Sequence, residues 1–265
     1  MDDLTWLKEF GRFLTFRMKR RVMTGVIFLA AIPSTILFHF PLEFRYFFAI
    51  VFTLLGTVPI YSTVQLITGS AMHLIRFALY SRKHKPEEID YPEVKRIAKK
   101  MGLDYDKPIY VTDNPIVNCP CVNLLSKKIA IPRSWLTKHH RSELLAAIGH
   151  ELGHIKNWRK YLKEIILASF APVGFIFGLA IITGILGLAY IPIFVQIGGY
   201  AFMLLMLSYV FWRNEYRADK ESGETVGAAP LIAVLEMLQN QVKKDEGSET
   251  HPPFHERIRR LRSLL

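Results

Sequence analysis

The sequence has only two cysteines, Cys119 and Cys121, in 265 residues. A single pair two positions apart cannot supply the network of cross-links that stabilises small secreted domains, so we expect two buried, reduced thiols. Acidic residues are also in the minority, because 34 Lys and Arg against 23 Asp and Glu give a formal net charge of +11. Few cysteines and an excess of basic residues are not typical of an ordinary secreted domain. The distribution of charge along the chain is therefore the more informative feature.

Charge is missing altogether from three long stretches. Residues 165–212 form a run of 48 positions without Asp, Glu, Lys or Arg, more than twice the roughly 20 residues that one spanning helix needs. The stretches 22–40 and 46–75 hold 19 and 30 uncharged residues. We therefore predict four transmembrane helices, two in the first part of the chain and two forming a hairpin that turns at 190–192.

The basic residues predict the orientation of these spans. Of the 34 Lys and Arg residues, six precede the first span, one lies between the first two, 18 lie in 76–163 and nine follow residue 212. By the positive-inside rule, both termini and the large middle segment face the cytosol. The same charges favour a lipid bilayer as partner, and because no nucleic-acid-binding motif accompanies them, we expect no nucleic acid partner.

These patterns divide the chain into five parts. They are an interfacial amphipathic helix at 1–21, spans 1 and 2 within 22–75, a first cytosolic segment at 76–164, the spanning hairpin at 165–212, and a second cytosolic segment at 213–265. Within the cytosolic segments we expect short helices at 93–101 and 228–243, a strand at 109–112, a hairpin of 122–125 with 129–131, and a long helix from Arg141 into the third span.

The long helix carries the strongest chemical signal, His150-Glu151-Leu152-Gly153-His154. The i, i+4 spacing puts both imidazoles on one helical face, where they can bind one metal ion. Glu151 is rotated about 100° from His150, so it suits a general base beside the metal better than a ligand.

A catalytic zinc needs a third protein ligand and an open position. Glu215 and Asp219 share one helix face just beyond the fourth span, and the hairpin returns them to the membrane side that His150 and His154 occupy. The alternative is a juxtamembrane ion-pair cluster with Arg213 or Arg217. Spacing alone leaves both interpretations open.

From about Ile109 onward the chain resembles the HtpX-type membrane zinc metalloproteases, relatives of the CAAX prenyl endopeptidases among the gluzincins. The resemblance rests on three ordered motifs. They are His150 to Asn157, Glu215-Tyr216-Arg217-Ala218-Asp219, and His251-Pro252-Pro253 followed by Glu256-Arg257-Ile258.

The resemblance implies a role for each of these residues. It makes Glu215 the third zinc ligand beside His150 and His154, with one Zn²⁺ per chain, and Asp219 an acceptor that orients a ligand histidine. It implies that His251 and Arg257 contact the substrate carbonyl or the developing oxyanion. It also implies that Asn118 binds substrate on an edge strand.

The expected fold is a mostly α integral membrane protein with four transmembrane helices and a cytosolic α+β zincin-like domain. The resemblance implies a zinc endopeptidase with Glu151 as base, acting on membrane or unfolded proteins at the cytosolic face of a prokaryotic cytoplasmic membrane, in membrane protein quality control. A CAAX-type prenyl-protein endopeptidase is one alternative, although its relatives carry more spans. The other is a signal transducer with a regulated protease domain, for which the outward loops are too short to form a sensor.

Overall fold

The computed structural model describes residues 86–114, 117–124, 126–185, 191–242, 245, 247–248 and 250–265, with backbone only for 169–185, 191–201 and 203–204. The predicted interfacial helix and the first two predicted spans lie outside these residues. The chain divides into two units, one comprising Gly69–Glu164 with Val210–Leu265 and the other including Ile165–Tyr209. All predicted site residues belong to the first of these units.

A four-stranded sheet forms one part of this unit, in the order β1-β2-β4-β3. The strands are β1 Glu87–Ile89, β2 Ile109–Thr112, β3 Cys121–Asn123 and β4 Lys128–Pro132. The central pair β2 and β4 is parallel, and both outer pairs are antiparallel. The predicted strand at 109–112 and the predicted hairpin are confirmed, with Val122 opposite Ile129. Strand β3 lies at one edge of the sheet.

Helix α4, Pro92–Lys100, shares a hydrophobic core with the sheet and with α6. Its buried positions Val94, Ile97 and Ala98 recur at helical spacing, which places one apolar stripe against that core. The chain leaves the helix at Gly102, where φ is +74°, a conformation that favours glycine. The predicted helix at 93–101 is therefore confirmed to within a residue at each end.

Two short elements of the structure were not predicted from the sequence. Strand β1 lies in the charged stretch expected to be a linker, and it pairs with β2 through backbone groups. Helix α5, Arg133–Lys138, begins directly after Pro132 and buries Trp135. Both elements have six residues or fewer, too few for hydrophobic periodicity to distinguish them from loops.

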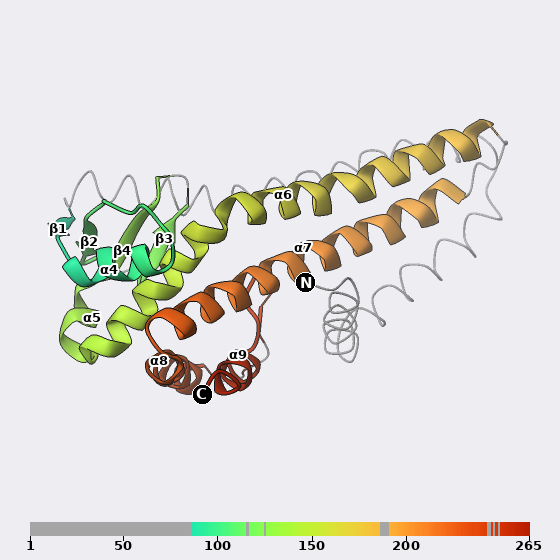
Figure 1. The fold of residues 1–265 in the computed structure, drawn as a ribbon. Coiled ribbons are helices and arrows are strands. Elements are labelled where there is room, and N and C mark those ends of the chain that lie inside the picture. Colours follow the sequence, from blue (N-terminus) through green and yellow to red (C-terminus); the bar gives the residue numbers. More distant parts are fainter. Residues whose placement is uncertain are drawn as a thin grey trace. The chain divides into compact units, whose positions relative to one another are not determined.

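Two long helices carry the functional motifs. Helix α6 runs without interruption over Arg141–Ile185 and α7 over Ile191–Thr225, so the predicted long helix from Arg141 is confirmed (Figure 1). The turn predicted at 190–192 is wrong for its last two residues, because Ile191 and Pro192 begin α7. A proline fits the first turn of a helix, where its missing N–H would have no intrahelical partner.

Among the residues that the structure describes, no helix is both long enough and apolar enough to cross a membrane. The four spans stay a prediction.

Helices α8, Ala228–Gln241, and α9, Phe254–Arg262, lie side by side near the carboxyl end (Figure 1). Their buried side chains form a second core with Ala146 of α6. The members from α8 and α9 include Leu231, Leu235, Ile258 and Leu261. This packing brings the third motif, at the start of α9, to the same unit as the other two.

Two glycines let α6 and α7 approach closely near the motifs. A Cβ on Gly153 would lie 2.8 Å from the Cα of Ala218, and a Cβ on Gly149 would lie 2.8 Å from Oγ of Ser222. Ser222 is fully buried and donates a hydrogen bond to the carbonyl of Ala146, 2.7 Å away. Because side chains larger than hydrogen would force the helices apart, these glycines set how near α7 comes to the histidines of α6.

Candidate metal centre

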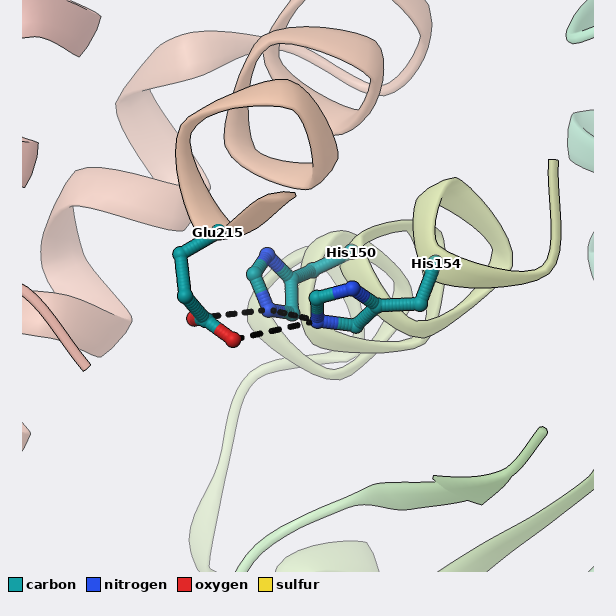
Figure 2. A group of neighbouring side chains, drawn as sticks. All are labelled: His150, His154 and Glu215. Atoms are coloured by element: carbon teal, nitrogen blue, oxygen red, sulfur yellow. Dashed lines mark hydrogen bonds and ion pairs between the residues drawn. The ribbon is translucent and has the colours of Figure 1, made fainter. Parts of the chain in front are cut away.

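His150 and His154 extend from one face of α6 toward the carboxylate of Glu215 on α7 (Figure 2). The two Nε2 atoms are 3.1 Å apart. Glu215 Oε2 lies 3.5 Å from Nε2 of His150, and Glu215 Oε1 lies 3.4 Å from Nε2 of His154. The structure thus brings the three predicted ligands together, although Glu215 follows His154 by more than sixty positions in sequence.

The spacing of these three atoms fits zinc. Ligand atoms about 2.0–2.1 Å from a tetrahedral ion lie about 3.3–3.4 Å from one another. The observed separations of 3.1–3.5 Å bracket that value. Two imidazoles and one carboxylate also form a ligand set that leaves one position open, as catalytic zinc requires. The residues present therefore fit a single zinc ion held by three side chains.

Asp219 lies directly behind His150. Its Oδ1 is 2.9 Å from Nδ1 of that histidine, and its side chain is almost completely buried. This is the position predicted for an acceptor that orients a ligand histidine. A carboxylate there favours the tautomer with the proton on Nδ1, which leaves Nε2 free for a metal.

Arg257 pairs with two carboxylates of α7. Its Nε and Nη2 each donate to a carboxylate oxygen of Asp219 at 2.7 Å, and its Nη1 lies 3.1 Å from Oε2 of Glu215. The side chain is 6% exposed. Because a buried guanidinium is tolerated only when carboxylates pair with it, these contacts account for the burial of Arg257.

The ionisation of the site follows from burial and these pairings. Burial opposes the charged form of Glu215, but Arg257, His251 and the two histidines outweigh it and hold its pKa well below the usual value. Burial raises the pKa of Glu151, against a smaller opposing effect of His150 and His154. A carboxyl group with a raised pKa, beside two imidazoles, is the kind of group that can take and return a proton.

His251 approaches the site from the loop before α9. Its side chain is 62% exposed, and its Nε2 lies 3.8 Å from Oε1 of Glu215. Its Nδ1 is 2.8 Å from the hydroxyl oxygen of Thr250. The exposed ring therefore presents Nε2 toward the ligand cluster while Thr250 holds the opposite nitrogen.

Asn118 lies outside the edge strand that was expected to contain it, because β3 begins at Cys121. Its side chain is exposed, and its backbone carbonyl accepts a hydrogen bond from Nε1 of the buried Trp135, 2.9 Å away. The substrate-binding role of Asn118 stays a prediction.

The two cysteines are part-buried, and burial raises the pKa of Cys119 to about 11 and that of Cys121 to about 12. Both thiols are therefore protonated at neutral pH.

The alternative interpretation of Glu215 and Asp219 as partners of Arg213 or Arg217 does not match the observed pairing. Arg217 forms two hydrogen bonds of 2.7 Å with Glu164 of α6, and Arg213 lies 3.5 Å from the same carboxylate.

Sequence reasoning missed one residue of the site, Asn214. Its amide lies 2.9 Å from Nδ1 of His154, and it is buried. The sequence feature that could have identified it is its position directly before Glu215 on the same helix.

Comparisons with known proteins agree with this geometry. Residues 90–265 match peptidase family M48. The chain is 25% identical over 225 residues to a Protease HtpX homolog of Tropheryma whipplei (strain TW08/27), covering 70% of this chain and 77% of the relative. It is 25% identical over 235 residues to the homolog of Dictyoglomus turgidum, covering 70% and 73%. A third relative is Protease HtpX of Idiomarina loihiensis, 25% identical over 211 residues, covering 68% and 73%.

Among solved structures, the crystal structure of S. mikatae Ste24p aligns with 97% of this chain at a TM-score of 0.49 and 18% identity. The chain spans 66% of that structure's length, just under two thirds.

Proposed function

Because the chain belongs to peptidase family M48 and is a metalloendopeptidase of the HtpX type, we propose that it uses one zinc ion to hydrolyse peptide bonds of membrane or unfolded proteins at the cytosolic face of a membrane. The observation that carries the proposal is the convergence of His150, His154 and Glu215 at separations suited to zinc. We assign these three side chains as the metal ligands.

Zinc in this position supplies a Lewis acid that polarises the scissile carbonyl and lowers the pKa of water. The chain itself supplies the proton transfer. Glu151 follows His150 on the same helix turn, and burial raises its pKa above the usual value. We propose that its carboxylate accepts the proton of the attacking water and then delivers it to the leaving amine.

His251 is proposed to donate a hydrogen bond to the oxyanion. Its ring is exposed, and its Nε2 lies 3.8 Å from Oε1 of Glu215. A donor close to the developing negative charge stabilises the transition state more than the ground state. Arg257 is proposed to act one step further away, since it fixes Asp219 and Glu215 instead of reaching substrate.

Several features support a membrane location. The 48-residue uncharged segment 165–212 and the distribution of Lys and Arg favour a hairpin inserted from the cytosolic side. Leu167 and Phe202 lie in this segment and are 68% and 48% exposed. Large apolar side chains on the surface of a helix favour contact with lipid or another protein. The relatives come from bacteria, which supports a prokaryotic cytoplasmic membrane.

The location also suggests the substrates. His154 is about three turns before residue 165 on α6, and Glu215 lies three residues after residue 212 on α7. A site this near the predicted bilayer favours extended segments that emerge from membrane proteins. This supports a role in clearing damaged or misassembled membrane proteins.

The proposal is tested by incubating detergent-purified, zinc-loaded protein with a reduced and carboxymethylated model protein and with the same protein in its folded form. We expect cleavage of the unfolded form only, loss of cleavage after chelation, and recovery when zinc is restored. Equal cleavage of both forms would contradict the substrate class, and cleavage that survives complete removal of zinc would contradict the mechanism. Carbonate extraction of cell membranes tests the location, because an integral protein stays in the pellet.

A further inference from the structure

We propose that Asn214 is a positioning residue for the zinc ligand His154, accepting the Nδ1 proton of its imidazole through the side-chain oxygen. The inference rests on the metal site proposed above. It adds a residue to that site to which neither the sequence motifs nor the family resemblance gave a role.

Asn214 is almost completely buried, so contact with solvent does not explain a polar side chain at its position. It is 5% exposed, on α7, directly before Glu215. Its amide nitrogen lies 2.9 Å from Nδ1 of His154. Its Oδ1 is buried and has no hydrogen-bond partner among the described residues. A buried amide that leaves one polar atom unpaired costs free energy, so its contact with His154 is the feature that accounts for a polar side chain here.

Metal coordination supplies a donor at this contact. A neutral imidazole carries one proton, and a histidine that binds a metal through Nε2 must carry it on Nδ1. In the cluster, Nε2 of His154 faces His150 and Glu215, while Nδ1 faces Asn214. Half a turn of the amide about the Cβ–Cγ bond exchanges its nitrogen and oxygen, which are nearly the same size. The oxygen then accepts the Nδ1 proton.

The two ligand histidines are therefore supported differently. His150 has a carboxylate partner in Asp219, whereas His154 has a neutral amide. The charge balance explains the difference, because the single guanidinium of Arg257 already pairs with both Asp219 and Glu215. An amide provides an acceptor without burying a third negative charge in the same space.

Two variants separate the hydrogen bond from packing. Asn214→Leu keeps a similar volume and removes the acceptor, while Asn214→Asp keeps an acceptor oxygen. Ser222→Ala is the matched control, because Ser222 is also buried on α7 and bonds to a backbone carbonyl of α6 rather than to a histidine side chain. The measurement is the zinc dissociation constant, obtained by competition with a chromophoric chelator on the full-length protein in detergent, with the melting temperature of each variant recorded beside it.

We expect Asn214→Leu to bind zinc about 10- to 100-fold more weakly, as loss of an acceptor behind a ligand histidine does elsewhere. We expect Asn214→Asp to recover most of that loss, and Ser222→Ala to lower the melting temperature with unchanged zinc affinity. The inference is overturned if Asn214→Leu binds zinc as tightly as wild type, or if Asn214→Asp binds as weakly as Asn214→Leu. If the wild type itself binds no zinc, the metal site fails, and the role of Asn214 fails with it.

Discussion

Arg257 meets Asp219 side on, with Nε and Nη2 each 2.7 Å from one carboxylate oxygen. The same carboxylate lies 2.9 Å from Nδ1 of His150, and the third nitrogen of the guanidinium lies 3.1 Å from Glu215. One cation on α9 therefore holds two carboxylates of α7, one of which supports a ligand of α6. Helix α9 contributes to the metal site without supplying a ligand.

Replacing Arg257 by Met should destabilise the fold strongly. The change keeps much of the side-chain volume but leaves Asp219 and Glu215 without their cation, and removing one partner of a buried pair costs about 3–5 kcal/mol. Arg262→Met is the matched control, since Arg262 is exposed on the same helix and pairs with Glu236 at 3.0 Å, a surface contact worth about 0–1 kcal/mol. Denaturant unfolding of both variants checks this. Equal stability of the two would contradict the anchoring role.

Gly153→Ala should be more damaging than Gly149→Ala. The new Cβ at position 153 meets backbone atoms of Ala218 at 2.8 and 3.1 Å, whereas the one at position 149 meets side-chain atoms of Ser222 and Val226 at 2.8 and 3.0 Å. Backbone cannot move aside as side chains do, so we expect a loss of about 1–3 kcal/mol for Gly153→Ala and a smaller loss for Gly149→Ala. Melting temperatures rank the two, and the reverse order would show that the helices do not approach as described.

Zinc binding should release a proton near neutral pH. Burial opposes the charged form of His150, but Asp219 and Glu215 outweigh it and raise its pKa from 6.5 to about 10 in the protein without metal. The charged imidazole therefore contributes its full stabilisation to the folded, metal-free protein below pH 6.5. This stabilisation is lost as the pH rises through about 10. Because zinc needs the neutral ring, its apparent affinity should rise about tenfold per unit between about pH 7 and pH 8.5.

Calorimetric titrations in buffers of different ionisation enthalpy measure the released proton directly. Asp219→Asn is the informative variant, since removal of this carboxylate lowers the pKa of His150 and should flatten the pH dependence. An affinity for zinc that does not change with pH would show that His150 is already neutral before the metal binds.

The elements recognised from the sequence are those whose pattern is local. The β-branched and aromatic residues at Ile109–Thr112, the stop at Gly102 and the long unbroken helix from Arg141 are each recognisable from neighbouring residues. The meeting of Glu215 with the two histidines was also predictable, because a hairpin returns the chain to the same side. Strand β1 was not, since its pairing with β2 depends on backbone bonds that no side-chain pattern reports.

The contacts around the ligands were less predictable than the ligands themselves. The pairing of Arg257 with Asp219 joins α9 to α7 across 38 positions, and Asn214 meets His154 across 60. Spacing along one helix carries no information about such pairs. The resemblance named Arg257, but its pairing with Asp219 and Glu215 depends on how α9 packs on α8 and α6.

Glu151 is assigned the proton transfer in a site whose metal would be held by other residues. The most direct measurement compares wild type with Glu151→Gln for two quantities on the same samples, the zinc content and the rate of cleavage of an unfolded protein. We predict unchanged zinc content and a rate lower by at least about 10²- to 10⁴-fold, the usual loss when a general base is removed. If the variant keeps zinc and cleaves at the wild-type rate, Glu151 is not the base and the mechanism is wrong.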